Sequence, residues 1–509
     1  MKPANAILSG YGTTVFEVMS RLAMEKGAIN LGQGFPDDNG PSAVVAAAQA
    51  ALADRPNQYP PMMGVPDLRQ AVAAHNKRFY DLDVDWQTET MVTSGATEAL
   101  ASCLFGLIEP GDEVVLIEPL YDCYLPIIRR AGGIPKLVRV EPPRWELPYE
   151  ALAAAFSDKT KLILLNSPMN PAAKVFSREE LGFIADLVKK HDAYAVCDEV
   201  YEHIVFDGLT HHPLMMLPGM RDRCVRIGSA GKTFSLTGWK VGYVTACPAL
   251  LQPISKCHQF LVFTTAPNLQ RAVAFGLTQD DGYFAGLAAS MQAKRDRFSE
   301  GLRRIGFAVQ PCQGTYFVNA GFAPLGFTGD DAEFCRHIIE EAGVAAIPVS
   351  AFYQDQQSAV RTTARFCFSK QDAVLDEALA GAGIDRRKAW VTNAVKHFKF
   401  APRGRMRIHR RPDSGEIVQC RWWLKQEIAL VRPRLILAMG ATAIEALTGR
   451  RARMAELRGR PVEIAAGIPV LATWHPSYLL RLQDGTRWAE ASAQFRHDIA
   501  IAADIVGNG

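Results

Sequence analysis

Four short apolar runs, each followed by a polar cluster, constrain the fold of residues 90–245 more than any other feature. Runs of this length, bounded by polar and turn residues, predict buried strands, and apolar residues at helical spacing predict helices between them. The expected strands are 113–119, 161–168, 193–200 and 224–231, and the clearest helix is 178–191. This alternation predicts an α/β domain with a parallel sheet covered by helices on both faces.

The polar clusters stand where such a sheet binds ligands. In open α/β sheets, ligands bind outside the carboxyl ends of the strands. Those ends carry the sequences "EPLYDCY", "NSPMNP", "DEVY" and "GSAGK". Four clusters in register predict one binding site assembled from all four strand ends.

Lys232 is the candidate reactive group of this site. It follows the last expected strand among small residues, with Ser229 three positions earlier and Lys240 eight later. Such a lysine can form a Schiff base with an aldehyde cofactor, although a lone lysine in a turn is usually a surface residue. Asp198 and Tyr201 end the neighbouring strand. A buried carboxylate needs a cationic partner, and a protonated pyridine nitrogen is one.

Further residues extend the candidate site. Asn170 can donate a hydrogen bond to a phenolate oxygen, and Tyr121 can stack on an aromatic ring. Gly95, Ala96 and Thr97 stand at the start of an expected helix, where free N–H groups hold a phosphate.

These residues lie in motifs that resemble a known enzyme family. "NSPMNPAAKVF", "CDEVYEHIVFDG", "GSAGKTFSLTGWKVGY" and "ARFCFSK" resemble the fold-type-I pyridoxal-phosphate aminotransferases, closest to the kynurenine/glutamine and methionine branch. The likeness covers roughly residues 3–380. It implies a large domain with a mixed, mainly parallel sheet, a small α+β domain, pyridoxal 5'-phosphate as cofactor, and amino acid and 2-oxo acid substrates.

The resemblance assigns roles around the cofactor ring. Lys232 would be the Schiff-base lysine and the proton carrier between substrate carbon and cofactor. Asp198 would pair with the pyridine nitrogen and keep it protonated. Tyr201 and Asn170 would bind the ring oxygen, and Tyr121 would stack on the ring.

It also assigns roles at the two ends of the cofactor. Ser229 and Lys240 would join the backbone of residues 95–97 around the phosphate. Arg365 would clamp the substrate α-carboxylate in a bidentate fork, with Gly34 lining that end. The family's "NPxGK" glycine is replaced by Ala173, which would strain a turn if its φ were positive.

Tyr59 implies an assembly. It matches the residue that reaches the neighbouring subunit's phosphate, so the resemblance implies an active homodimer. The implied organisation is an N-terminal arm and small-domain part (1–35), a large cofactor-binding domain (36–280), a small domain (281–384) and a further module (385–509). No second arginine is supplied for a distal carboxylate, so a neutral amino donor such as methionine, glutamine, an aromatic residue or kynurenine is expected.

Charge separates the last module from the rest of the chain. Residues 1–384 hold 34 Lys+Arg against 42 Asp+Glu, whereas residues 385–509 hold 22 against 11. A basic module on an acidic body suggests a polyanionic partner such as DNA. A solvated, arginine-rich surface is the open alternative.

The last module resembles the iron–sulfur type of uracil-DNA glycosylases, closest to the UdgX branch. The stretches that carry the likeness are 388–400, the arginine-rich "RGRMRIHRRPDSGE", residues 432–449 and "IPVLATWHPSYLLR". His409 matches the histidine that becomes attached to deoxyribose after uracil leaves. Asn393 matches the uracil-reading asparagine, His475 the histidine that contacts the flipped base, and Arg481 follows it.

The two resemblances overlap in one expected helix, "SKQDAVLDEALAGAGIDRR". Everything that the glycosylase family places before this helix is absent, including the acidic catalytic loop. Cys420 alone matches a cluster ligand, and His397 stands where relatives have another cysteine, so we expect no iron–sulfur cluster. The expectation is a truncated α/β module that binds DNA weakly without excising uracil.

Cysteine usage and apolar runs bear on location. The ten cysteines form no C-x-x-C pair, which favours buried thiols in a reducing compartment. No signal peptide or membrane-spanning run is evident, so we expect a cytoplasmic protein with no metal ligands and no membrane contact.

Two functions remain: an aminotransferase fused to a glycosylase-like module, or a uracil-DNA-binding protein or glycosylase that uses the aminotransferase part as a scaffold.

Overall fold

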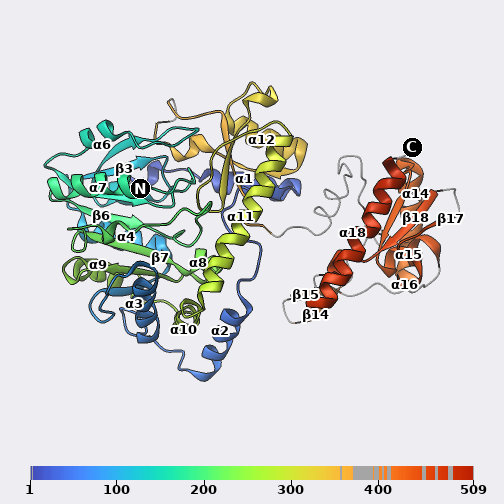
Figure 1. Cartoon of the computed structure of the whole chain (residues 1–509), viewed down its shortest axis with the longest axis horizontal. Coiled ribbons are helices and arrows are strands. Elements are labelled where there is room, and N and C mark those ends of the chain that lie inside the picture. The colour runs from blue at the N-terminus through green and yellow to red at the C-terminus, as the bar shows by residue number, and fades with distance from the viewer. Residues whose placement is uncertain are drawn as a thin grey trace. The chain divides into compact units, whose positions relative to one another are not determined.

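The chain forms two compact units, Met1–Gln371 and Asp372–Gly509, in a computed structural model. Figure 1 shows the elements of both units along the chain. The structure describes residues 2, 4–355, 358–370, 392, 394, 400–403, 406–409, 414–449, 454–464, 468–479 and 485–507.

A seven-stranded sheet forms the centre of the first unit. Its strand order is β2–β8–β7–β6–β5–β3–β4, parallel from β7 to β4, with β8 antiparallel to β7 and β2. The sheet is therefore mixed and mainly parallel. Its strands are β2 (Thr90–Thr93), β3 (Glu113–Glu118), β4 (Ile134–Arg139), β5 (Thr160–Asn166), β6 (Tyr194–Asp198), β7 (Cys224–Ser229) and β8 (Gly242–Ala246).

Both faces of this sheet are buried, which explains the continuous apolar runs of its strands. Side chains of a strand point alternately to the two faces. On β5, Ile163 joins a core with Leu181 of α7 (Arg178–Lys190). Leu164 joins a different core with Leu100 of α4 (Gly95–Leu107). One strand thus contributes to two hydrophobic cores.

Helices connect and cover these strands (Figure 1). Helix α7 begins at a capping box in which the Ser177 hydroxyl accepts from the Glu180 N–H while the Glu180 carboxylate accepts from the Ser177 N–H. The other helices of this part are α2 (Ser42–Asp54), α3 (Pro66–Tyr80), α5 (Tyr124–Arg130), α6 (Tyr149–Ala155), α8 (Ala230–Thr233), α9 (Pro248–Leu261) and α10 (Pro267–Leu277).

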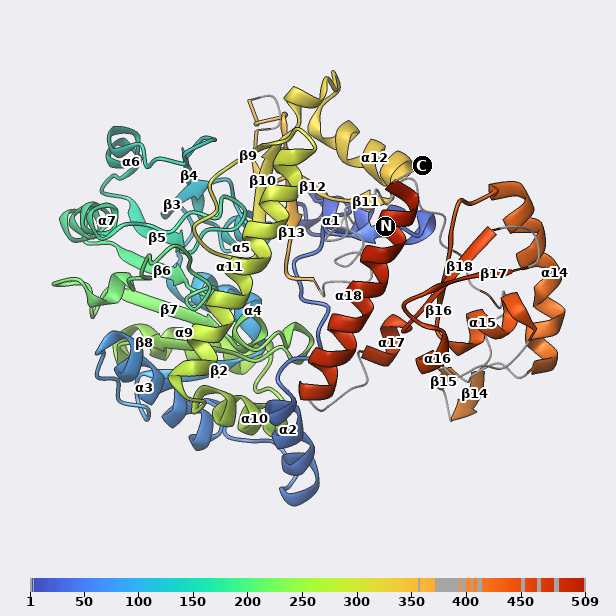
Figure 2. The same cartoon turned by 45° about the vertical axis from the view of Figure 1, so that its right-hand side comes forward.

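A smaller sheet completes the first unit. Its order is β12–β13–β10–β9, and all its pairs are antiparallel. The long helix α11 (Asp281–Arg304) runs from the region of α10 to this sheet in both Figure 1 and Figure 2. The elements are β9 (Ala308–Val309), β10 (Phe317–Gly321), β12 (Ile347–Pro348), β13 (Thr363–Cys367), the parallel pair β1 (Ile29–Asn30) and β11 (Val344–Ala345), and helices α1 (Val15–Lys26) and α12 (Asp331–Ala342).

The second unit is α/β as well. A three-stranded sheet, β16–β18–β17, pairs β16 parallel and β17 antiparallel to β18. A separate hairpin pairs β14 with β15. The elements are β14 (Phe400–Arg403), β15 (Met406–His409), α14 (Ser414–Val431), β16 (Ile436–Met439), α15 (Ala441–Thr448), α16 (Met454–Leu457), β17 (Pro461–Ile464), β18 (Ile468–Thr473), α17 (Pro476–Leu479) and α18 (Gly485–Gly507).

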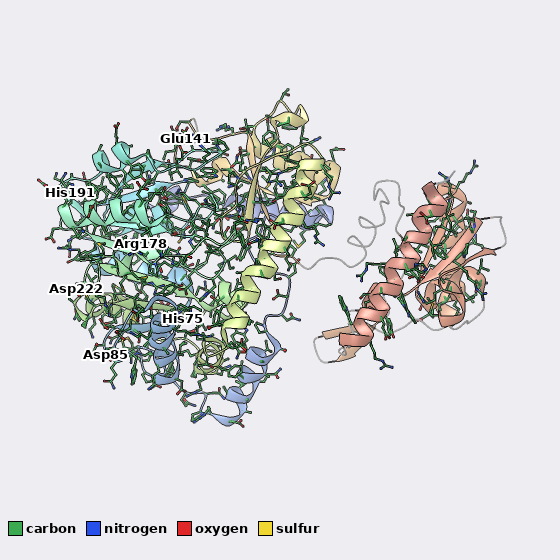
Figure 3. All side chains as sticks on the ribbon, in the orientation of Figure 1. His75, Asp85, Glu141, Arg178, His191 and Asp222 are labelled. Carbon is green, nitrogen blue, oxygen red and sulfur yellow. The ribbon has the colours of Figure 1, made fainter. Side chains whose placement is uncertain are left out.

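Side chains pack throughout the described parts of both units (Figure 3). In the second unit, buried Asp498 of α18 accepts from Thr473 at 2.8 Å and pairs with Arg458 at 3.0 Å, which ties α18 to the sheet. Among the described helices, none combines the length and apolar character needed to cross a membrane.

Candidate active site

A cavity of about 360 Å³ opens at the carboxyl ends of the large-sheet strands. Apart from Tyr59, every residue predicted for the first unit's site lines it. These residues are Gly34, Gly95, Ala96, Thr97, Tyr121, Asn170, Asp198, Tyr201, Ser229, Lys232, Lys240 and Arg365. The structure therefore brings together positions up to 331 residues apart in the chain.

Lys232 is held at the wall of this cavity by α8, directly after β7. Its Nζ donates to the Tyr316 hydroxyl at 2.8 Å and lies 3.5 Å from the Gly34 carbonyl oxygen. Burial lowers the pKa of the Lys232 ammonium to about 8, although the Asp198 carboxylate opposes this effect. Near neutral pH the amine can therefore lose its proton and act as a nucleophile or base.

Asp198 ends β6 and is buried. Its Oδ2 accepts from the Tyr124 hydroxyl at 2.7 Å, and its Oδ1 accepts a long 3.4 Å bond from the Val200 N–H. Burial raises the pKa of the Asp198 carboxyl above its usual value, and these hydrogen bonds and Lys232 partly offset the rise. A cationic ligand group beside Asp198 would favour its ionised form.

Arg365 lies on β13, with 1% of its surface exposed. Its Nη1 donates to Asn170 Oδ1 at 2.7 Å, and its Nη2 donates to the Gly32 carbonyl at 3.0 Å. Its Nε is buried without a hydrogen-bond partner. Burial lowers the pKa of the guanidinium to about 10. The ring of Phe317 lies 3.9 Å from Cζ and fixes the plane of the group.

The first turn of α4 also lines the cavity. Its N–H groups have no partner within the helix, which makes the turn suited to an anion. A Cβ on Gly242 would stand 2.7 Å from the Gly95 carbonyl carbon, so glycine lets β8 approach this turn. Lys240 has a left-handed φ of 54°, and its Nζ would lie 3.5 Å from a Cβ on Gly95. The Ser229 hydroxyl accepts from the Gly231 N–H at 3.2 Å.

This donor set fits pyridoxal phosphate. The cofactor requires an amine, a carboxylate beside a ring nitrogen, a hydrogen-bond partner for the ring oxygen and a phosphate cradle. The cavity supplies Lys232, the buried Asp198 with its raised pKa, the side chains of Tyr201 and Asn170, and the α4 turn. The unpartnered Nε of Arg365 leaves a donor for a substrate carboxylate.

Sequence reasoning missed several residues of the site. Tyr316 donates to the Gly34 carbonyl at 2.6 Å and accepts from Lys232, and Tyr124 donates to Asp198. Asp122 and Asn166 also line the cavity. Tyr124 and Asp122 stood in the quoted "EPLYDCY" cluster, whereas nothing near Tyr316 marked it as part of the site.

Tyr59 stands apart from the cavity. Its side chain is 86% exposed, and its ring meets Phe263 edge to face at 5.8 Å.

Ala173 has a φ of 58°, the left-handed conformation for which the family's glycine is suited.

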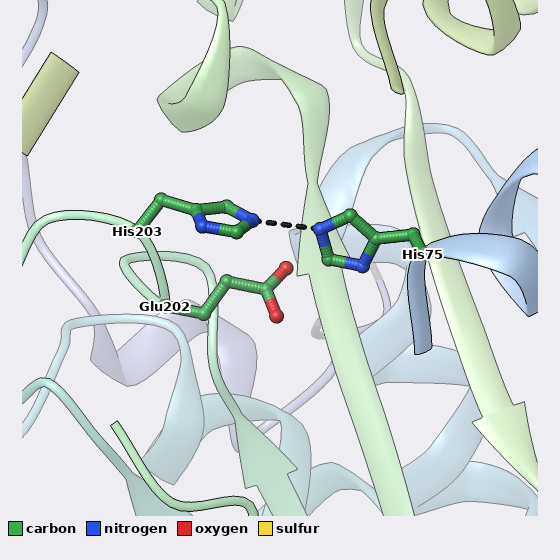
Figure 4. Close-up of side chains that lie close together, drawn as sticks. All are labelled: His75, Glu202 and His203. Atoms are coloured by element: carbon green, nitrogen blue, oxygen red, sulfur yellow. Dashed lines mark hydrogen bonds between the residues drawn. The ribbon is translucent and has the colours of Figure 1, made fainter. Parts of the chain in front are cut away.

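His75, Glu202 and His203 form the one group in the described parts of the chain whose ligand atoms could surround a metal ion (Figure 4). The two Nε2 atoms are 2.7 Å apart, which is a hydrogen bond between the rings. Glu202 Oε2 already accepts from Tyr80 at 2.7 Å and from Arg226 at 3.1 Å. The arrangement is therefore a hydrogen-bonded ion-pair network.

In the second unit, two of the four predicted residues lie within the described residues. His409 ends β15, and its backbone pairs with Phe400. His475 stands between β18 and α17, where its carbonyl accepts from the Tyr478 N–H at 2.8 Å. Its Cβ would lie 3.0 Å from a Cβ on Gly440, at the start of α15. Asn393 and Arg481 lie outside the described residues, as do residues 371–387 of the expected shared helix.

Fold and cavity together define a fold-type-I pyridoxal-phosphate aminotransferase. Residues 26–381 match the model of the aminotransferase class I and II family, and the chain belongs to that family. Membership implies pyridoxal phosphate, and such enzymes use amino acid and 2-oxo acid substrates and are typically dimeric. The prediction of fold and enzyme class is confirmed.

Curated relatives and solved structures carry several substrate names. The chain is 44% identical over 381 residues to a probable N-succinyldiaminopimelate aminotransferase of Mycobacterium tuberculosis, covering 73% of this chain and 96% of the relative. It is 38% identical over 364 residues to the methionine aminotransferase of Escherichia coli, covering 72% and 94%. The structure of the Mycobacterium tuberculosis N-succinyldiaminopimelate aminotransferase superposes with a TM-score of 0.71, covering 74% of this chain and 98% of that one at 44% identity.

A second family matches the C-terminal part of the chain. Residues 354–497 match the uracil DNA glycosylase superfamily, so a glycosylase-like region follows the aminotransferase. The two matched ranges share residues 354–381. The predicted fusion of two families is confirmed.

Proposed function

We propose that the chain is a pyridoxal-phosphate-dependent aminotransferase that takes the amino group of a neutral amino acid and passes it to a 2-oxo acid. The observation that carries the proposal is Lys232. Its amine is buried in a cavity with Asp198 and Arg365, and its pKa is lowered to about 8. Bound pyridoxal phosphate supplies the aldehyde that takes up amino groups and a ring that accepts electrons from the substrate carbon.

Lys232 would hold the cofactor through Nζ and, once released, would remove the proton from the substrate Cα and return it to the aldehyde carbon of the cofactor. Tyr316, 2.8 Å away, keeps Nζ aimed into the cavity. Asp198 remains anionic against the pyridine nitrogen, supported by the Tyr124 hydroxyl. This negative charge keeps the ring nitrogen protonated, which makes the ring a stronger electron acceptor.

The remaining contacts fix the cofactor. Tyr201 and the amide nitrogen of Asn170 bind the ring oxygen, since Asn170 Oδ1 is already engaged by Arg365. Tyr121 stacks on the ring. Ser229 and Lys240 bind the phosphate with the backbone N–H groups of Gly95, Ala96 and Thr97, whose helix N-terminus favours negative charge.

Arg365 binds the substrate α-carboxylate through its fork, with Gly34 at the same end. A Cβ on Gly34 would stand 2.5 Å from the Phe317 ring, so the glycine makes room beside the arginine. Tyr59 serves the partner subunit's cofactor phosphate in a homodimer, which accords with its 86% exposure in the single chain.

The lining of the cavity favours a neutral side chain on the donor. Its cations are Lys232, Lys240 and Arg365, all assigned to the cofactor or the α-carboxylate, and Asp122 adds a carboxylate. Burial raises the pKa of Asp122 while Arg365 opposes the rise. A second carboxylate on the substrate would meet Asp122 without a cation of its own.

A second donor class is favoured by one finding. The relative that is 44% identical is described as acting on N-succinyldiaminopimelate, a donor with further carboxylates. A direct comparison separates the two. Purified dimer loaded with cofactor should show a kcat/KM for methionine and phenylalanine well above that for glutamate and N-succinyldiaminopimelate. The reverse order would replace the neutral-donor assignment.

For the second unit we propose weak DNA binding without uracil excision. Residues 385–509 carry 22 basic against 11 acidic side chains, which favours phosphate contacts with little sequence preference. His409 stands as the nucleophile candidate, with Asn393, His475 and Arg481 as contacts to a flipped base. Excision also needs a group that stabilises the departing uracil. On a denaturing gel, uracil-containing single-stranded DNA should show neither cleavage after alkali nor a covalent band, and a band lost in His409→Ala would refute this.

A further inference from the structure

The segment that carries Asp198 has two chemically different sides. Asp198, Val200 and Tyr201 line the cavity. Glu199 and Glu202 of the same segment do not line the cavity; they are also buried but face a polar cluster. Such a pair of buried carboxylates is costly unless it is matched by positive charge.

Arg226 of β7 supplies that match. Its Nε donates to Glu199 Oε2 at 2.7 Å, and its Nη2 donates to Glu202 Oε2 at 3.1 Å. Its Nη1 donates to Asn76 of α3, and its guanidinium lies 4.5 Å from the ring of Tyr80. One side chain thus joins α3, β7 and the segment after β6.

Other contacts lock the same segment. The Tyr80 hydroxyl donates to Glu202 at 2.7 Å, and His211 lies 3.1 Å from Glu199. His203 bonds to His75 of α3 at 2.7 Å (Figure 4). Glu199, Glu202 and His203 are therefore all anchored on the side that does not line the cavity.

The cluster also acts on Asp198 through charge. Burial opposes the ionisation of Glu199, but Arg226 and then His211 outweigh it and lower its pKa, so Glu199 is anionic. The negative charge of Glu199 in turn raises the pKa of the neighbouring Asp198 carboxyl. Arg226 is positioned to offset that charge.

We propose that Arg226 is a positioning residue of the cofactor site. It fixes residues 198–203 from the side that does not line the cavity, and it shields Asp198 from the charge of Glu199. This role rests on the proposed function, because it concerns the carboxylate that faces the cofactor ring. It adds to that function a residue that neither lines the cavity nor touches a substrate.

The test follows cofactor affinity against pH. Apoprotein is titrated with pyridoxal phosphate at a series of pH values, and the dissociation constant is read from the visible absorbance. Binding requires anionic Asp198, so affinity is lost as pH falls through its pKa, which defines an acid limb. Other groups that act on Asp198 are unchanged in the variants; they are Lys232, Tyr124, Val200, Cys123, Tyr121 and Tyr201.

Arg226→Met removes the cation and keeps much of the volume. The acid limb should move to higher pH by about one unit, which is a tenfold weaker affinity on that limb. Adding Glu199→Gln to Arg226→Met should return the limb toward its original position. Glu199→Gln alone should move it to lower pH, and this variant decides the question where Arg226→Met does not fold.

The matched control is Arg295→Met. Arg295 is likewise buried, pairs with Asp207 at 2.6 Å and with Asp296, and lies 4.9 Å from the Phe206 ring, but it does not line the cavity or contact residues 198–203. It should lower the thermal midpoint without moving the acid limb. Identical acid limbs for Arg226→Met, Glu199→Gln and wild type would overturn the proposal. Wild-type protein that binds no cofactor would overturn the proposed function and this inference together.

Discussion

Tyr124→Phe tests how the protein keeps Asp198 ionised. The Tyr124 hydroxyl makes the shorter of the two hydrogen bonds to this carboxylate, 2.7 Å against 3.4 Å for the Val200 N–H. A hydrogen bond to a buried charged group contributes about 1.5–3 kcal/mol. Since one pKa unit corresponds to about 1.4 kcal/mol, its loss should raise the pKa of Asp198 by about one to two units.

The direction of the change in cofactor affinity follows because the cofactor binds the ionised form of Asp198. Burial already raises the pKa of Asp198, so a further rise lets the group take up a proton at higher pH. Cofactor affinity in Tyr124→Phe should therefore fall away at a pH about one to two units higher than in wild type. Titration of the apoprotein with pyridoxal phosphate across a pH series measures this directly.

The control is Tyr283→Phe. Its hydroxyl also makes a single 2.8 Å bond, but to the neutral carbonyl of Thr233, and Tyr283 does not line the cavity. Both variants lose a hydroxyl and some stability. If the pH dependence of binding is the same in Tyr124→Phe, Tyr283→Phe and wild type, the hydrogen bond does not support the charge of Asp198 and the reasoning is wrong.

Three further changes test other parts of the account. Arg365→Lys should lower kcat/KM for methionine roughly 10- to 100-fold, since a bidentate charged contact contributes about 1.5–3 kcal/mol, while the cofactor dissociation constant stays within twofold. Asp122→Asn should raise kcat/KM for glutamate relative to methionine, whereas the exposed control Asp158→Asn should leave the ratio unchanged. Gly242→Ala would place its Cβ 2.7 Å from the Gly95 carbonyl carbon and should weaken cofactor binding, measured by equilibrium titration, more than Gly238→Ala, which has open space. Unchanged affinity in Gly242→Ala would mean that the close approach is not needed for the phosphate cradle.

The sequence predicts most of the large sheet because its buried strands are continuous apolar runs. β3, β5, β6 and β7 lie within two residues of the expected bounds. β2, β4 and β8 were not predicted. β4 follows a short helix and is only partly buried, and the antiparallel β2 and β8 carry threonine and tyrosine that blur the apolar pattern.

Some residues of the site could likewise be predicted from the sequence and others could not. Asp198 and Ser229 could be predicted because they end strands, and Lys232 because it closely follows one, where the chain order reveals the shared edge. Tyr316 could not, since it reaches Lys232 across 84 residues from the segment before β10. The role of Arg226 also required coordinates, because its partners come from α3 and the segment after β6.

The central claim is that Lys232 carries the cofactor, and reductive trapping tests it most directly. Protein saturated with pyridoxal phosphate is reduced with borohydride, digested and mapped by mass spectrometry. Lys240 serves as an internal control, because it is a second lysine lining the same cavity but is assigned to the phosphate. The account predicts the reduced pyridoxyl group on the peptide that contains Lys232, and its loss in Lys232→Ala. A label on Lys240 or on another lysine of the wild-type protein, or no label despite saturation, would contradict it.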